Sequence, residues 1–221
     1  RAYTLATRVG DAEAARAADS FIPAGSFFGL LRGKTLPTPD DPLERVTPPV
    51  LGLAQALVRA GDTEAALGEL LIALARSEGE AEAVALAEAL QDLGEYGASS
   101  ERARAFVEAG SRARRTYRAA YPRAFAGAVR AAAGEFGVPP ALLWATMRQE
   151  SHFYPRAVSV SNARGPMQFV PGTWVYVAEL LGEPPADPFS VAASTRYGAF
   201  YLSRLLSSFG GNLAQSVAAY N

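Results

Sequence analysis

Glu150 is the residue best placed for acid–base chemistry. The run Gly137-Val138-Pro139-Pro140 stops one helix and starts another, because a proline in the first turn needs no backbone donor. We therefore predict a helix from Pro140 to Ser151 that carries Glu150 in its last turn. The residues seven, four and three places before Glu150 share its face and are mostly apolar: Leu143, Thr146 and Met147. This spacing predicts a carboxylate that points inward.

Burial and the negative end of the helix dipole both disfavour an ionised carboxylate. We therefore expect the pKa of Glu150 to be raised toward the range that suits a general acid. The alternative is a glutamate at the helix rim that pairs with Arg148 or Arg156. Helical periodicity by itself leaves that alternative open.

Metal and cofactor chemistry has little support in the residue types. The chain has no cysteine and a single histidine, His152, which directly follows Glu150-Ser151. Because a standard metal cluster needs several such ligands, we expect His152 to be exposed or hydrogen-bonded rather than a ligand. We predict no cofactor and no metal.

Helices must position these side chains. Ala, Leu, Glu and Arg dominate and runs of β-branched residues are scarce, so we predict an all-α protein. Leucines recur at helical spacing and predict amphipathic helices with one buried stripe: Leu67, Leu70, Leu71 and Leu74, then Leu86, Leu90 and Leu93. Gly61 and Gly94 are expected to end two helices.

A weak internal repeat precedes the Glu150 segment. The spacing Ala-x-x-Leu-x-x-x-Gly-x-x-x-Ala runs from Ala54 to Ala65 and again from Ala87 to Ala98, about 33 residues later. That period is typical of stacked helical hairpins. The prolines between Thr35 and Pro49 predict an extended connector before it. We therefore predict three parts: an N-terminal helical fragment and linker over 1–46, a helical-repeat arm over 47–121, and a catalytic domain over 122–221.

Charge and hydropathy exclude two classes of function. The 21 Lys+Arg and 22 Asp+Glu leave a net charge of −1, which removes the electrostatic basis for a nucleic-acid binder. No apolar run approaches the roughly 18 residues that cross a bilayer, so we predict no transmembrane segment in this chain. The cluster Arg112, Arg114, Arg115 and Arg118 is interpreted as a solvated helix face. Because the chain begins with Arg, we interpret it as lacking its targeting segment.

Three short blocks follow one another in the C-terminal half: Glu150-Ser151, Gly165-Pro166-Met167-Gln168 and Ala219-Tyr220-Asn221. They resemble the lytic transglycosylases of the bacterial cell wall, whose pattern has a Glu-Ser pair ending a helix, a Gly-Leu-Met-Gln loop and an Ala-Tyr-Asn segment. The resemblance covers roughly Tyr121 to Asn221. It implies a goose-lysozyme-like helical fold for the C-terminal domain. The helices before it resemble the superhelical arm of the soluble branch of the family.

Two departures from the family pattern bear on activity. Pro166 stands where the family has leucine, which removes a backbone donor and an apolar contact beside the cleft. The chain also stops at Asn221, where family members continue, so we expect the catalytic domain to be truncated.

The resemblance implies that Glu150 works without a second carboxylate. Ordinary glycosidases place two carboxylates around the bond, but the other acids after Gly137 are Glu179 in a helix-like run and Glu183 and Asp187 beside Pro-rich turns. Glu150 would protonate the leaving oxygen of a MurNAc-GlcNAc linkage, assisted by the N-acetyl group of the substrate. It would then deprotonate the C6 hydroxyl, which closes a 1,6-anhydro ring.

The predicted substrate-binding residues are Ser151, Met167, Gln168, Tyr220 and Asn221. Ser151 and Tyr220 would contact the N-acetyl group or orient Glu150, and the Gln168 amide would bind sugar hydroxyls or the acetamido carbonyl. Taken alone, Tyr220 also fits a half-buried aromatic residue whose hydroxyl bonds to a backbone carbonyl. The stacking candidates Trp144, Phe153, Phe169 and Trp174 are left out of the site, Trp144 because its helical spacing favours the core.

Two other functions stay open. A muramidase of the same fold would use Glu150 in the same way but deliver water. A helical scaffold that binds glycan or protein without turnover would explain Pro166, although it gives no reason to retain Glu150. The family substrate implies a periplasmic or other extracytoplasmic location and peptidoglycan glycan strands as the partner.

Overall fold

The computed structural model describes residues 43–220. Ten helices make up this part, and its only extended pairings are isolated bridges from Arg164 to Val158 and Phe169. The prediction of an all-α protein is confirmed for these residues. None of their helices is both long and apolar enough to cross a membrane. The predicted N-terminal fragment, most of the proline-rich connector, and Asn221 lie outside the described residues.

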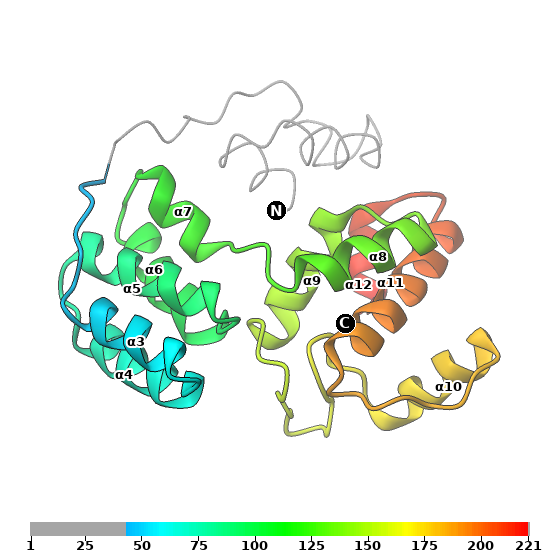
Figure 1. The fold of residues 1–221 in the computed structure, drawn as a ribbon. Coiled ribbons are helices and arrows are strands. Elements are labelled where there is room, and N and C mark those ends of the chain that lie inside the picture. The colour runs from blue at the N-terminus through cyan, green and yellow to red at the C-terminus, as the bar shows by residue number, and fades with distance from the viewer. Residues whose placement is uncertain (1–42, 221) are drawn as a thin grey trace. The chain divides into compact units, whose positions relative to one another are not determined.

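The described chain divides into two compact units, 43–124 and 125–220 (Figure 1). The first unit holds α3 (Val50–Arg59), α4 (Thr63–Arg76), α5 (Glu80–Asp92), α6 (Gly97–Glu108) and α7 (Arg114–Ala120). Each of these helices packs against the next one along the chain. The boundaries of the three predicted parts stay predictions.

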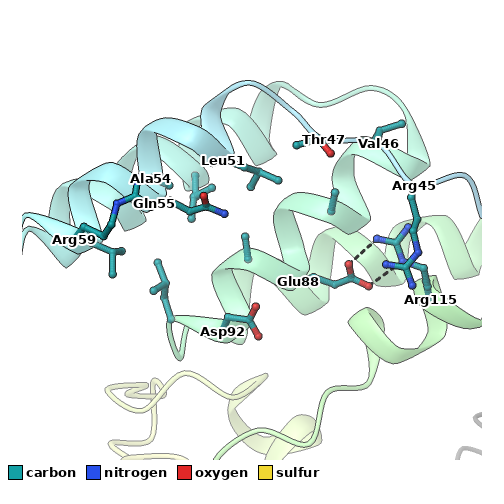
Figure 2. Close-up of a pocket in the computed structure, with 15 residues that line it drawn as sticks. Arg45, Val46, Thr47, Leu51, Ala54, Gln55, Arg59, Glu88, Asp92 and Arg115 are labelled. Carbon is teal, nitrogen blue, oxygen red and sulfur yellow. Dashed lines mark hydrogen bonds and ion pairs between the residues drawn. The ribbon is translucent and has the colours of Figure 1, made fainter.

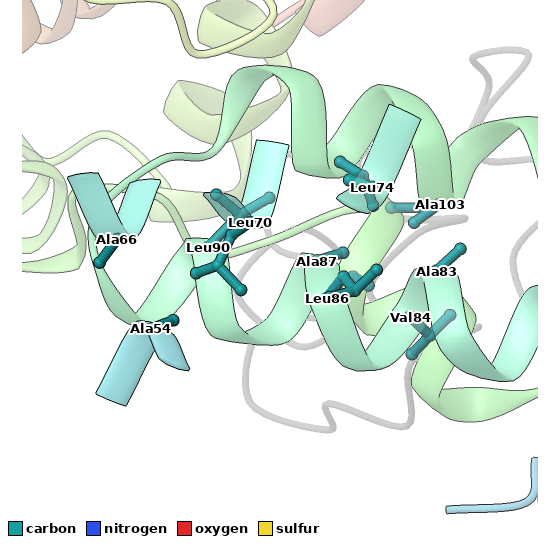
Figure 3. Packing of buried hydrophobic residues seen from close by; sticks show 12 residues of the cluster. Ala54, Ala66, Leu70, Leu74, Ala83, Val84, Leu86, Ala87, Leu90 and Ala103 are labelled. Atoms are coloured by element: carbon teal, nitrogen blue, oxygen red, sulfur yellow. The ribbon is translucent and has the colours of Figure 1, made fainter. Parts of the chain in front are cut away.

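Leucine and alanine fill the core of the first unit (Figure 3). Leu70 and Leu74 of α4 and Leu86 and Leu90 of α5 lie in the buried part of this core. The small alanines of the cluster let the helix backbones approach closely. Leu67, Leu71 and Leu93 are partly buried against this cluster. The buried stripe predicted from leucine spacing is therefore confirmed.

The two copies of the internal repeat form the same helix ends. Gly61 and Gly94 have φ of 85° and 84° and follow α3 and α5. In each copy the residue after the glycine donates its amide to the repeat leucine carbonyl, Asp62 to Leu57 and Glu95 to Leu90, both at 2.9 Å. The same two acids then accept the amide of the repeat alanine, at 3.0 Å for Ala65 and 3.1 Å for Ala98. The prediction that both glycines end helices is confirmed.

The solvated-face interpretation of the basic cluster is wrong for Arg115. Its guanidinium forms an ion pair with Glu88 of α5, with Nη2 and Oε2 2.6 Å apart. Arg112, Arg114 and Arg118 are exposed, but Arg112 precedes α7 rather than lying on it. The pair crosses from α7 to α5, which sequence spacing along one helix does not reveal.

A groove of about 580 Å³ opens in the first unit, with the Arg115–Glu88 pair on its rim (Figure 2). Ala54, Leu70 and Ala85 supply buried apolar lining, and every lining residue belongs to 45–115. The groove therefore takes no residue from the Glu150 segment.

The second unit is organised around α11. It holds α8 (Ala126–Phe136), α9 (Pro140–Ser151), α10 (Pro171–Leu181), α11 (Val191–Ser208) and α12 (Leu213–Tyr220). Helix α11 packs against all four others, so it is the common wall of this unit (Figure 1). Its buried face carries Tyr197, Gly198 and Leu202. Prolines occupy the first turns of α9 and α10, as the predicted start of α9 required.

Replacing glycine with alanine should change the stability of the protein in opposite directions at two positions of the first unit. Gly94→Ala places a side chain at a φ of 84° and should destabilise the protein by about 1 kcal/mol. Gly68→Ala lies inside α4, where an added Cβ meets nothing within 4 Å, and should stabilise it by roughly 0.5 to 1 kcal/mol. Urea unfolding followed by circular dichroism measures both changes. Equal signs would contradict this reading of the helix end.

Candidate active site

Glu150 lies where the sequence predicted it. Helix α9 runs from Pro140 to Ser151, so the predicted helix is confirmed. Leu143, Thr146 and Met147 on the same face are buried, and Glu150 itself is half-buried. Burial raises the pKa of Glu150 above its usual value of 4.5, as expected for a carboxyl removed from water. Helix periodicity therefore gave the correct direction for this side chain.

The carboxylate has no charged partner in the described part of the chain. Nothing among residues 43–220 forms a hydrogen bond or ion pair with it, so the alternative pairing with Arg148 or Arg156 is not found there. The Arg156 guanidinium lies instead over the Phe189 ring, 5.6 Å from its centroid. A desolvated and unpaired carboxyl can hold its proton to higher pH, which a general acid requires.

A strained turn follows Glu150 directly. His152 and Phe153 both have left-handed φ, 49° and 67°, which L side chains adopt at an energetic cost. Phe153 is buried and His152 is exposed, so the turn is anchored by the phenylalanine. The Ser151 hydroxyl is buried and donates to the Met147 carbonyl at 3.0 Å. The structure thus places the Ser151 hydroxyl against the backbone of its own helix.

The second block forms a tight turn that accommodates its proline. The backbone N–H of Gln168 donates to the Gly165 carbonyl at 3.2 Å, and this bond closes a β-turn with Pro166 in the second position. Proline is favoured there, and its missing N–H removes no bond of the turn. Gly165 has φ of 74°, and a Cβ on it would lie 2.0 Å from the Pro188 carbonyl oxygen. This loop therefore needs glycine at 165 and tolerates proline at 166.

The Gln168 side chain is bound to the backbone of its own loop. Its amide nitrogen donates to the Gly165 carbonyl at 2.8 Å and to the Ala157 carbonyl at 3.1 Å. Both N–H groups are then used, so its carbonyl oxygen is the atom left to bind a ligand donor. The predicted contact from this amide to an acetamido carbonyl does not suit that arrangement.

Tyr220 of the third block is brought to the second block. Its hydroxyl donates to the Met167 carbonyl at 3.0 Å, and its ring packs edge-on to Phe169 with centroids 5.6 Å apart. Burial, and then the charges of Glu150 and Tyr201, raise the pKa of Tyr220 well above its usual value. The charge of Glu150 therefore acts on the Tyr220 hydroxyl. A hydroxyl bonded to a backbone carbonyl is what we expected if Tyr220 were simply a half-buried aromatic residue.

Tyr201 packs against Tyr220, although the predicted site residues do not include it. It lies on α11, with its ring centroid 5.6 Å from Tyr220 and 5.8 Å from Phe169. Tyr197 and Tyr201 are four residues apart, so the spacing places them on one face of a helix. It does not show that Tyr201 packs against Tyr220 of α12, because that contact is tertiary. Phe153, Phe169 and Trp174 are buried, whereas Trp144 is only half-buried, so its expected core position is not fully reached.

The other acids of this unit have different partners or positions. Glu183 accepts both Nη1 contacts of Arg196 at 2.8 Å, and Glu135 of α8 pairs with the same arginine at 2.8 Å. Asp187 accepts the Phe189 amide, and Glu179 is exposed on α10. Within the described residues, no group of His, Cys, Asp and Glu could hold a metal ion.

Comparison with known proteins agrees with this geometry. Residues 127–221 match the family model described as the Transglycosylase SLT domain. This part of the chain belongs to that family. The SLT domain thus includes all three blocks and both residues that interact electrostatically, Glu150 and Tyr220.

Two curated relatives contain a segment similar to part of this chain. The soluble lytic murein transglycosylases of Escherichia coli strain K12 and of Escherichia coli O157:H7 are each 32% identical to this chain over 88 residues. Each match covers 38% of this chain and 14% of the relative, so the chain matches a small part of those proteins.

Solved structures show the same fold over more of the chain. The 70-kDa soluble lytic transglycosylase from Escherichia coli has a TM-score of 0.62 at 22% identity, covering 84% of this chain and 29% of that one. An inactive Glu-to-Gln mutant of the lytic transglycosylase Slt from Pseudomonas aeruginosa has a TM-score of 0.65 at 23% identity, covering 100% and 38%. The predicted all-α class with a lysozyme-like C-terminal fold is confirmed.

Replacing the half-buried carboxyl should stabilise the protein near neutral pH. Because folding raises the pKa of this carboxyl, its ionisation at high pH lowers the free energy of unfolding. Below the unfolded-state pKa the carboxyl is protonated in both states, and this loss of stability is absent. The Tm of Glu150→Gln should therefore exceed that of the wild type at pH 7, with the difference vanishing below about pH 4. Calorimetry across this range measures it. A difference that does not change with pH would contradict the assignment to Glu150 ionisation.

Proposed function

We propose that this SLT domain cleaves the MurNAc-GlcNAc β-1,4 linkage of peptidoglycan as a lytic transglycosylase. The observation that carries the proposal is the Glu150 carboxyl, which is half-buried, raised in pKa by burial and unpaired in the described residues. Its charge also acts on the Tyr220 hydroxyl. Such a group can give a proton and later take one back. Peptidoglycan glycan strands are then the partner, and a location outside the cytoplasm follows from where that polymer lies.

The first step is proton transfer to the leaving sugar. Protonated Glu150 donates to the glycosidic oxygen while the bond from this oxygen to C1 of the muramic sugar breaks. The carbonyl oxygen of the substrate's own N-acetyl group attacks C1, so the protein need not supply a nucleophile. This step leaves Glu150 ionised and a cyclic intermediate on the muramic sugar.

The second step closes the product ring. Ionised Glu150 takes the proton of the C6 hydroxyl, the C6 oxygen bonds to C1, and the acetamido oxygen leaves C1. The product is a 1,6-anhydro-MurNAc end, Glu150 is protonated again, and no water is consumed. One carboxyl therefore suffices for both proton transfers.

The partners of the other acids support a single-carboxyl mechanism. Glu135 and Glu183 are paired with Arg196, and Asp187 accepts a backbone amide. The names of the relatives agree, since both are soluble lytic murein transglycosylases and a Glu-to-Gln mutant of the Pseudomonas enzyme is inactive. A 70-kDa soluble lytic transglycosylase has also been solved in complex with bulgecin A, at 20% identity and a TM-score of 0.63.

The proposed roles of the other predicted residues follow from their free atoms. The Gln168 carbonyl oxygen accepts a sugar N–H or O–H, and the Tyr220 oxygen accepts from the substrate or from protonated Glu150. Met167 supplies the carbonyl that orients Tyr220, and Ser151 holds the end of α9. Substrate contact by Asn221 stays a prediction, because this residue lies outside the described part of the chain.

Digestion of purified peptidoglycan tests the reaction. The wild type should release muropeptides with anhydro ends, one water lighter than hydrolysis products, and Glu150→Gln should lower the rate at least about 100-fold. Mass spectrometry distinguishes these products. Glu179→Gln is the matched control, because Glu179 is an exposed acid of α10, and it should retain wild-type activity.

The other outcomes would each reject the proposal. Reducing ends lost in Glu150→Gln would make the protein a muramidase. Binding to peptidoglycan without release by any variant would make it a glycan-binding scaffold.

The pH dependence of kcat/KM tests the acid role separately. The reaction begins from protonated Glu150, so kcat/KM should fall as pH rises through its raised pKa. The midpoint of this alkaline limb should lie above 4.5, the usual glutamate value. Progress curves at constant ionic strength measure it. A limb at or below 4.5 would exclude Glu150 as the general acid.

A further inference from the structure

We infer that Ser194 and Gly198 of α11 are positioning residues of the proposed active site. They hold Met167, and the Met167 carbonyl in turn orients the Tyr220 hydroxyl. The inference rests on the proposed function for its effect on turnover. Neither residue belongs to the three sequence blocks.

Ser194 holds the backbone of Met167. The Met167 amide donates to the Ser194 hydroxyl oxygen at 3.2 Å, and both residues are completely buried. Without this oxygen the buried amide would have no partner in the present arrangement, which costs enough to move a loop. The Gly165–Gln168 turn is therefore docked on α11 by a specific bond as well as by apolar contact.

Gly198 holds the side chain of Met167. A Cβ built on Gly198 would lie 2.5 Å from Met167 Cε and 2.9 Å from Cγ, closer than side-chain atoms approach each other. Met167 thus packs on bare backbone of α11, one turn after Ser194. Any side chain at 198 must therefore displace the Met167 side chain from this surface of α11.

A displacement of Met167 changes the position of the Tyr220 hydroxyl. Its hydroxyl proton is directed at the Met167 carbonyl, 3.0 Å away, so its oxygen offers only lone pairs to other groups. A shift of Met167 therefore reorients or releases the hydroxyl that interacts with Glu150. Misplacements of this kind can lower turnover greatly without changing ground-state binding.

Ser194→Ala tests the bond to the Met167 amide. We expect kcat on peptidoglycan to fall on the order of 10-fold with KM changed less than about twofold. Thr195→Val is the matched control. Thr195 is the neighbouring buried residue, and its hydroxyl has no hydrogen-bond partner among the described residues, so the variant should keep wild-type kcat. Equal losses in both variants would overturn the inference, since they would reflect disturbance of α11 in general.

The Tyr220→Phe background tests the route of the effect. If Ser194 acts through the Tyr220 hydroxyl, adding Ser194→Ala to Tyr220→Phe should lower kcat by less than about twofold. If the two losses multiply, Ser194 acts on general stability and the inference is wrong.

A spectroscopic measurement separates this inference from the proposed activity. The chain of 221 residues has two methionines, Met147 and Met167, so its methyl-labelled NMR spectrum contains an internal reference. Gly198→Ala should move the Met167 methyl signal while the signal of Met147, buried in α9, stays in place. Unchanged signals would overturn the docking even if peptidoglycan is cleaved. A selective shift in a protein that cleaves nothing would instead retain the docking and reject the proposed function.

Discussion

The Glu150 carboxyl is half-buried without a charged partner in the described residues, and much of the C-terminal unit serves that arrangement. The apolar face of α9 carries it inward, and α9 stops immediately afterwards. Because the chain must then turn sharply, His152 and Phe153 take left-handed backbone conformations, and burial of Phe153 offsets their cost. The protein therefore keeps a destabilising backbone conformation next to Glu150, whose proposed chemistry requires an environment that disfavours its charge.

The site is organised before any ligand binds. The polar side chains of the three blocks bond to the protein's own backbone: Gln168 to two carbonyls, Tyr220 to a third and Ser151 to a fourth. Each bond uses a donor and leaves oxygen lone pairs. A site of this kind offers acceptors held in fixed positions, which costs little reorganisation during reaction. The donor and acceptor pattern therefore restricts how a sugar can be oriented more strongly than the residue types do.

The first unit follows simpler rules. Two copies of one helix end, each with a left-handed glycine, an acidic residue and an alanine amide, place successive helices side by side. Small alanines then permit close packing of α4 and α5 around four leucines. These contacts are local in sequence. The leucine spacing predicted the buried stripe, and the two glycines predicted the helix ends. The Arg115–Glu88 pair, which joins residues 27 positions apart, was missed for the opposite reason.

Local physics also accounts for what the sequence alone determined about the site. The helix from Pro140 to Ser151, the inward direction of Glu150 and the rise in its pKa all follow from helical period and proline chemistry. Tertiary structure decided which polar atoms remain free, that Pro166 fits its turn, and that Tyr201, Ser194 and Gly198 surround the Met167 loop. The last of these features depends on where α11 meets a loop about 30 residues earlier in the chain. Such a meeting is set by the packing of whole helices, and residue spacing within one segment carries no information about it.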